Sequence, residues 1–220
     1  MIFWDNDGVL VETESLYFRA TARVMAERGL ELTPDAYRQH FLVEASGLRA
    51  LVPGVNENEL ESLRSHRNAL YADFLASSSI TVDGAAETLA ELEGRYLMGV
   101  VTSSLREHFD LIHARTGFGR HFRFVLASGD YAEPKPHPAP YRAALGAAAA
   151  FGVRPEECVA IEDSLRGLTS AKAAGLTTWV VPGTLTVPAD FARADRVLSS
   201  IRDVPRVLAE AGDLVAGIAP

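Results

Sequence analysis

Several features that would assign a protein to a class are scarce or absent in this sequence. The 220 residues contain one cysteine, Cys158, so no disulfide can form within the chain, and we expect a reducing, cytoplasmic compartment. The 21 basic side chains include only two lysines, Lys135 and Lys172. No apolar run is long enough to span a bilayer, and we expect no secretory signal, because a basic region followed by an apolar stretch is missing at the start.

An excess of positive charge is also missing. The chain has 29 acidic residues against 21 Lys and Arg, and its formal net charge is −8. Nucleic acids and anionic membranes bind basic surfaces, so we expect no nucleic-acid partner and no membrane. A small anionic substrate is still possible, because a bound metal ion can reverse the local field. The hydrophobic share of 48% is typical of a globular protein. As a separate expectation, the protein is a monomer.

The periodicity of the chain changes twice. After a short apolar strand at residues 1–5, residues 13 to about 80 show helical spacing without a convincing strand. From Val82 onward, helical and strand patterns alternate, and the strands are continuous apolar runs such as "YLMGVVT" and "CVAIED". This alternation predicts a parallel sheet with right-handed crossovers and helices on both faces.

The sequence therefore predicts an α/β fold, with a Rossmann-like three-layer parallel-sheet core and an inserted all-α cap domain. We assign residues 1–12 and 82–220 to the catalytic core and residues 13–81 to the helical cap. Hinges are expected near residues 11–14 and 79–84, where "SSSITVDG" has the small, turn-prone residues of such a connection.

Polar residues follow four of the expected strands, at the edge where open parallel sheets bind ligands. They are Asp5 and Asp7 after the first strand, Thr102, Ser103 and Ser104 after the second, Lys135 after the third, and Glu162 and Asp163 after the fourth. Carboxylates suit a hard divalent cation, and an ammonium with hydroxyls suits a phosphate group. The set therefore favours Mg²⁺ together with a phosphorylated substrate.

The segments "DNDGVL", "VVTSS", "EPKPHP" and "AIEDS" resemble, in order and spacing, the four motifs of the haloacid dehalogenase-like superfamily. The branch is similar to the phosphoglucomutase-like phosphatases with a helical cap, and the resemblance covers nearly the whole chain. It implies a Mg²⁺-dependent phosphatase that hydrolyses a small phosphorylated metabolite, such as a sugar phosphate monoester, through an aspartyl-phosphate intermediate.

The resemblance also implies roles for individual residues. Asp5 matches the nucleophile, and Asp7 matches the acid that protonates the leaving oxygen and then activates water. The implied metal ligands are Asp5, the backbone carbonyl of Asp7, and Asp163, with Glu162 in or next to that shell. The implied phosphate-binding residues are Thr102, Ser103 and Lys135. Asn6 stands where relatives mostly have an apolar residue, and we interpret it as a polar turn residue. No function is assigned to the six histidines.

Three of the four motifs also have a plainer interpretation. Thr102 could be an ordinary β-branched strand residue, and Glu162 and Asp163 could cap the following helix. A calcium loop beginning at "DNDG" would need Gly and Glu where Leu10 and Leu16 stand, so that interpretation fails.

Other activities remain alternatives. A sugar phosphomutase of the β-phosphoglucomutase type is the main one, although Tyr17 replaces the histidine of such enzymes and no lysine precedes Lys135. A receiver-like phospho-acceptor domain is a weaker alternative, because its motif order differs and it needs no cap. A catalytically idle binding protein is disfavoured by the four intact motifs. True haloacid dehalogenases lack the second aspartate, so Asp7 argues against that activity. Phosphonate hydrolases of this fold use a cap lysine, and the predicted cap contains no lysine.

Substrate specificity is expected to come from the cap. Arg38, Glu44, Ser46 and Arg49 lie in the segment that we expect to cover the site, and Arg49 is our candidate for binding a substrate anion.

Overall fold

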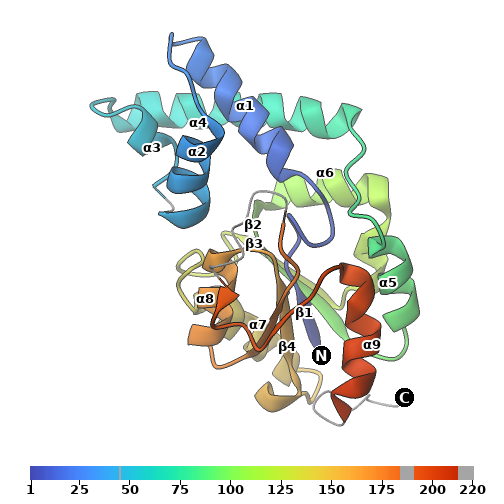
Figure 1. Ribbon diagram of the computed structural model, residues 1–220. Coiled ribbons are helices and arrows are strands. Elements are labelled where there is room, and N and C mark those ends of the chain that lie inside the picture. The colour runs from blue at the N-terminus through green and yellow to red at the C-terminus, as the bar shows by residue number, and fades with distance from the viewer. Residues whose placement is uncertain (45, 184–190, 213–220) are drawn as a thin grey trace. The chain divides into compact units, whose positions relative to one another are not determined.

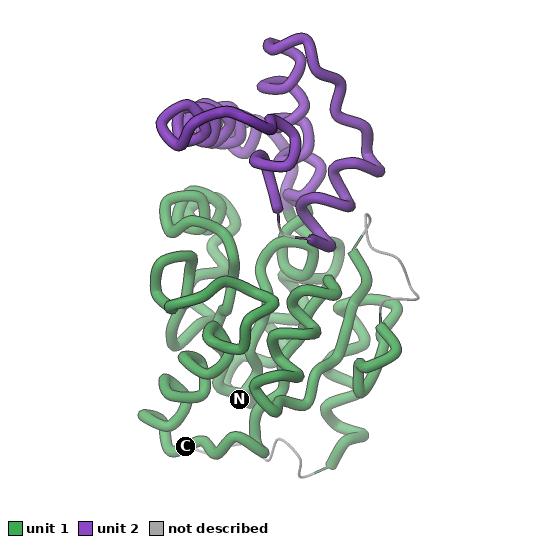
Figure 2. Tube along the Cα trace, turned by 90° about the vertical axis from the view of Figure 1, so that its left-hand side faces the viewer, with its two compact units in different colours: residues 1–12, 81–220 green, residues 13–80 purple. Residues whose placement is uncertain are grey.

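The computed structural model describes residues 1–44, 46–183 and 191–212 (Figure 1). The chain divides into two compact units, one of Met1–Glu12 with Thr81–Pro220 and the other of Thr13–Ile80 (Figure 2). No helix in the described residues is long and apolar enough to cross a membrane.

The first unit is built on a six-stranded parallel sheet with the strand order β3-β2-β1-β4-β5-β6. The strands are β1 (Ile2–Trp4), β2 (Met98–Leu105), β3 (Phe124–Ser128), β4 (Val159–Glu162), β5 (Thr177–Val180) and β6 (Arg196–Val197). The strand order changes direction between β1 and β4, which are neighbours in the sheet. Crossovers then leave toward opposite faces, so the loops after β1 and β4 border the crevice where such sheets bind ligands.

Helices cover both faces of this sheet. They are α5 (Ala85–Leu92), α6 (Arg106–Thr116), α7 (Ala139–Ala149), α8 (Leu165–Ala173) and α9 (Val204–Glu210). In Figure 1, α7 and α8 lie on one side of the strands, and α5 and α9 lie on the other. Because successive strand residues face opposite sides, Ile2 and Trp4 pack with α5 and α9, whereas Phe3 packs with Tyr141 and Ala144 of α7. The predicted three-layer core is confirmed.

The regular structure in the described residues of the second unit is all helical. It contains α1 (Glu14–Ala26), α2 (Pro34–Tyr37), a π-helical segment (Arg38–Val43), α3 (Leu48–Leu51) and α4 (Glu57–Ser77). α1 packs along α4. The hydroxyl of Thr33 accepts a hydrogen bond from the amide of Ala36, so Thr33 caps α2 with Pro34 in the first turn. The all-α insertion predicted from helical spacing is therefore present.

Candidate active site

The loop after β1 is shaped by a glycine. Gly8 has a φ of +88°, which side-chain-bearing residues rarely adopt. A Cβ atom at this position would lie 2.2 Å from Oδ2 of Asp163. The loop turns back here, since the amide of Leu10 donates to the carbonyl of Asn6 at 2.9 Å. Gly8 thus lets the Asp5–Asp7 segment approach the end of β4 closely.

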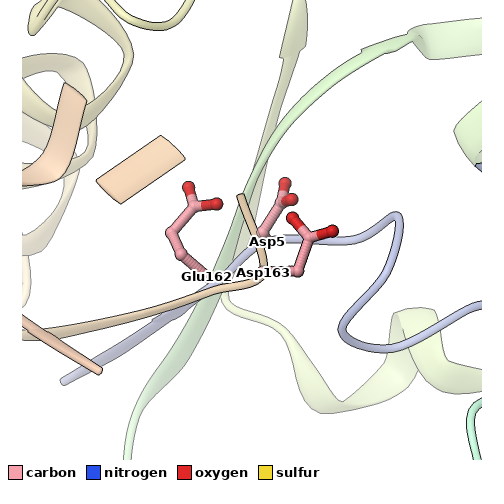
Figure 3. A group of neighbouring side chains, drawn as sticks. All are labelled: Asp5, Glu162 and Asp163. Atoms are coloured by element: carbon pink, nitrogen blue, oxygen red, sulfur yellow. The ribbon is translucent and has the colours of Figure 1, made fainter. Parts of the chain in front are cut away.

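Three carboxylates gather where β1 and β4 end. Each of Asp5, Glu162 and Asp163 offers an oxygen within 4.8 Å of the others (Figure 3). Oε2 of Glu162 is buried and has no hydrogen-bond partner among the described residues. Like charges this close need a cation between them or a proton on one of them. Oxygen donors are the preferred ligands of Mg²⁺, so the residues present fit this ion.

The first turn of α8 makes room for Glu162. A Cβ atom on Gly167 would lie 1.7 Å from Oε2 of Glu162, so a larger residue at this helical position would displace the Glu162 carboxylate. The hydroxyl of Ser164 accepts from the amide of Gly167 at 3.2 Å and caps the helix. Ser164 therefore caps the N-terminus of α8, and the Glu162 side chain points toward Asp5 and Asp163.

Lys135 is the cation that the structure places in this cluster. Its ammonium is buried and donates to Oδ1 of Asp5 at 3.0 Å, to Oε1 of Glu162 at 2.7 Å and to the carbonyl of Val101 at 2.8 Å. Its loop is fixed by Arg166, which donates to the Lys135 carbonyl at 2.7 Å. All three N–H donors of the ammonium therefore have acceptors.

Burial and charge act in opposite directions on these groups. Burial raises the pKa of Asp5 to about 7, although the nearby Lys135 ammonium opposes the rise. Burial lowers the pKa of Lys135, but the carboxylates of Asp5 and Glu162 outweigh it, and the net shift is upward. Lys135 therefore stays charged at neutral pH. Asp5 needs further positive charge nearby to be fully ionised there.

Tyr141 of α7 completes this side of the site and was missed from the sequence. Its hydroxyl donates to Oε1 of Glu162. Burial, followed by the neighbouring Glu162 charge, raises the pKa of Tyr141 well above its usual value. Tyr141 therefore remains a donor and holds Glu162 together with Lys135.

The side chain of Asp7 faces a different set of partners. Its Oδ2 accepts from Oγ of Ser104 at 2.6 Å, from Nδ2 of Asn6 at 3.2 Å and from Oγ1 of Thr102 at 3.3 Å. Among the described residues, the carboxylate group that could hold a metal ion consists of Asp5, Glu162 and Asp163 and does not include the Asp7 side chain. Two of the hydroxyl residues predicted at the end of β2 thus contact Asp7, while Ser103 is exposed.

Asn6 connects Asp7 to α6. Asn6 is fully buried, and its Oδ1 lies 2.8 Å from Nε2 of His113. Nδ1 of His113 lies 3.0 Å from the hydroxyl of Thr116. Burial lowers the pKa of His113 to about 4, with the charges of Asp7 and Asp110 opposing the shift, so the ring is neutral at neutral pH.

A family model of haloacid dehalogenase-like hydrolases matches residues 2–181. The chain belongs to this family. It is 33% identical over 216 residues to Protein CbbY of Cereibacter sphaeroides, covering 92% of this chain and 93% of that protein. It is 29% identical over 221 residues to a phosphoglycolate phosphatase of Nitrosococcus oceani, covering 96% of this chain and 97% of that one.

Solved structures agree with this membership in the haloacid dehalogenase-like family. A mutant of CbbY from Rhodobacter sphaeroides, solved in complex with xylulose 1,5-bisphosphate, superposes with a TM-score of 0.79 at 30% identity. The match covers 92% of this chain and 94% of that one. The predictions of a haloacid dehalogenase-like phosphatase and of an α/β fold are confirmed.

Within this family fold, sequence reasoning overlooked Asn6 and His113. The turn interpretation of Asn6 is incomplete, because its side chain links Asp7 to α6. A signal for Asn6 existed in its polar character between two aspartates. His113 carried a weaker signal, since it shares the buried face of α6 with Phe109 and Ile112 at helical spacing.

Arg49, the predicted anion-binding residue, belongs to the second unit. Its exposed guanidinium pairs with Glu57 of the same unit. The role of Arg49 toward a substrate stays a prediction.

Proposed function

We propose that this protein is a Mg²⁺-dependent phosphatase that hydrolyses a small phosphorylated metabolite through an aspartyl-phosphate on Asp5. The observation that carries this proposal is a group of three convergent carboxylates at the switch point of the sheet, two of which, Asp5 and Glu162, pair with the buried Lys135. Such a site combines a nucleophile with groups that attract a phosphate dianion.

Asp5 is the proposed nucleophile. Its carboxylate oxygen would attack phosphorus, the bond from phosphorus to the ester oxygen would break, and Asp7 would give its proton to the leaving oxygen. The Asp7 carboxylate would then take a proton from water while the water oxygen attacks phosphorus. Cleavage of the bond between phosphorus and Asp5 would release inorganic phosphate and regenerate both aspartates.

Charge compensation makes this attack feasible. Asp5, Glu162, Asp163 and the backbone carbonyl of Asp7 would hold Mg²⁺, which would neutralise charge on the transferring phosphoryl group. Lys135 lies 3.0 Å from Asp5 Oδ1 and would keep a positive charge beside the nucleophile. Thr102 and Ser103 complete the proposed phosphate-binding set.

The proposed substrate class is a sugar phosphate or a related small monoester. CbbY from Rhodobacter sphaeroides was solved with xylulose 1,5-bisphosphate, and another relative is a phosphoglycolate phosphatase. In this proposal the helical unit contributes specificity, with Arg49 binding a second anionic group. The site would act on soluble monoesters in the cytoplasm.

A metabolite panel with two readouts tests the proposal. Purified protein with Mg²⁺ would be given xylulose 1,5-bisphosphate, phosphoglycolate and β-glucose 1-phosphate with a trace of glucose bisphosphate. Released phosphate and glucose 6-phosphate would be followed together. We expect phosphate release from at least one compound and its loss with a chelator. Isomer formation outrunning phosphate release would favour the phosphomutase, and undiminished turnover in chelator would contradict the metal assignment.

A further inference from the structure

Four side chains form a continuous chain of hydrogen bonds from α6 to Asp7. Thr116 contacts Nδ1 of His113 at 3.0 Å, Nε2 of His113 contacts Oδ1 of Asn6 at 2.8 Å, and Nδ2 of Asn6 donates to Oδ2 of Asp7 at 3.2 Å. Asn6 is fully buried and His113 is nearly so. Burying a polar group without a hydrogen-bond partner costs folding free energy. The contacts along this chain avoid that cost.

The chemistry of the groups fixes the direction of every proton in this chain. Oδ2 of Asp7 accepts from Asn6, Ser104 and Thr102, so a proton carried by Asp7 would sit on Oδ1. Asn6 must therefore turn its amide nitrogen toward Oδ2 and its oxygen toward His113. His113 must then donate from Nε2. Because the buried ring is neutral at neutral pH, its Nδ1 accepts from the hydroxyl of Thr116. All donors point toward Asp7.

We propose that Asn6 and His113 are positioning residues for the acid and base function of Asp7. The inference rests on the proposed phosphatase mechanism and adds two residues to it. The amide of Asn6 holds Oδ2 of Asp7 alongside the hydroxyls of Ser104 and Thr102. Fixing Oδ2 from these directions sets the rotation of the carboxyl group, and thereby the direction in which Oδ1 points.

The two residues act as one unit. An apolar residue at position 6 would remove a donor from Asp7 and leave the buried Nε2–H of His113 without its acceptor. An apolar residue at position 113 would leave Asn6 free to rotate its amide. Small errors in the placement of a catalytic group reduce turnover strongly, so either change should affect proton transfer more than phosphoryl attack.

The dependence of turnover on the leaving group provides the test. Aryl phosphates of similar shape, from p-nitrophenyl phosphate to phenyl phosphate, differ in how much the leaving oxygen needs a proton. We expect Asn6→Leu to reduce kcat on phenyl phosphate about tenfold more than on p-nitrophenyl phosphate, because only the poorer leaving group requires the acid. KM should change little for either compound.

Matched variants separate positioning from general damage. His113→Phe should reproduce the leaving-group effect, and the double variant should be no worse than the stronger single variant. His113→Gln keeps a side-chain N–H for Asn6 and should restore much of the loss. His121→Phe alters another buried histidine, one paired with Glu93, and should leave the ratio unchanged. Melting temperatures would show that all variants fold.

A second readout does not depend on activity. Nitrogen NMR of the imidazoles, assigned with His113→Phe, should show His113 with its proton on Nε2, and this signal should shift in Asn6→Leu. A proton on Nδ1, or equal losses on all aryl phosphates, would overturn the positioning role. A wild-type protein inactive on the whole series would instead count against the proposed phosphatase, and the NMR result alone would then decide the hydrogen-bond chain.

Discussion

Two neighbouring residues at the end of β1 lie in opposite electrostatic surroundings. Asp5 contacts the charged Lys135, with Glu162 and Asp163 close by. Asn6 contacts the neutral ring of His113 through one uncharged hydrogen bond and donates a second hydrogen bond to the carboxyl group of Asp7. Both surroundings are buried. Ionic interactions hold the first one together, whereas hydrogen bonds with fixed donors and acceptors hold the second. We call them the ionic side and the neutral side.

The ionic side is incomplete by itself. Three carboxylates face one ammonium, so full ionisation leaves an excess of negative charge that a divalent cation would balance. The neutral side carries no such excess of charge, because the neutral ring of His113 is hydrogen-bonded to Asn6 and Thr116. The ionic side should therefore respond strongly to charge changes and to metal, whereas the neutral side should respond to hydrogen-bond geometry and acid.

The largest effect is expected from Asp5→Asn on the ionic side. The amide has nearly the same shape but is no nucleophile, so kcat should fall by at least about 10³-fold. The unfolding free energy should be kept or raised in chelator, because one of the crowded carboxylates is gone. Phosphate release and urea unfolding check both statements, and substantial remaining turnover would remove Asp5 from its central role.

Removing the buried ammonium is expected to destabilise the fold. Lys135→Met leaves Asp5 and Glu162 together without their cation, and breaking such a buried pair costs about 3–5 kcal/mol. Lys172→Met is the matched control, since Lys172 pairs with Asp195 nearer the surface and should cost at most about 1 kcal/mol. Urea unfolding in chelator measures both variants.

Mg²⁺ sharpens the same experiment. If the ion binds the carboxylates, it should return part of the stability that Lys135→Met loses.

Lys135→Arg should not restore activity, because a forked guanidinium does not replace a compact ammonium in a tight site. Equal stability losses for the two lysines would contradict the ionic side as described.

Acid should weaken the neutral side through His113. Its pKa is lowered from 6.5 to about 4 in the folded protein, so the unfolded chain binds a proton first as pH falls. The unfolding free energy should therefore decrease between about pH 6.5 and 4, by at most about 3 kcal/mol from this residue. His113→Gln should flatten that part of the pH profile. An unchanged slope would show that His113 is not held neutral.

The fold was accessible from sequence because its physical causes are local and repeated. Buried parallel strands such as Val159–Glu162 appear as continuous apolar runs, and polar residues at their ends share one sheet edge by topology. Asp5, Lys135 and Asp163 could therefore be brought together from the order of the strands alone. The structure also brings Glu162 into this cluster, and its buried, unpartnered oxygen could not be foreseen.

The neutral side could not be predicted in the same way. Asn6 and His113 are separated by 107 residues, and their contact depends on how α6 packs against the loop after β1. An isolated histidine on a helix has no pattern that names its partner. The partner of Tyr141 was hidden for the same reason, because the spacing of α7 indicates burial but not the Glu162 acceptor.

The smallest effect distinguishes a charged acceptor from a neutral one. The hydroxyl of Tyr141 donates to Glu162, whereas that of Tyr131 donates to the carbonyl of Thr102 at 2.7 Å. Hydrogen bonds to charged groups contribute about 1.5–3 kcal/mol and neutral ones about 0.5–1.5 kcal/mol. Tyr141→Phe should therefore cost about 2 kcal/mol of unfolding free energy and Tyr131→Phe about 1 kcal/mol, measured in chelator at neutral pH. Each change removes one oxygen atom, and the complete burial of Tyr141 adds to the effect of its charged acceptor. Equal losses would mean that Glu162 carries no charge, and the ionic side would then rest on Lys135 and Asp5 alone.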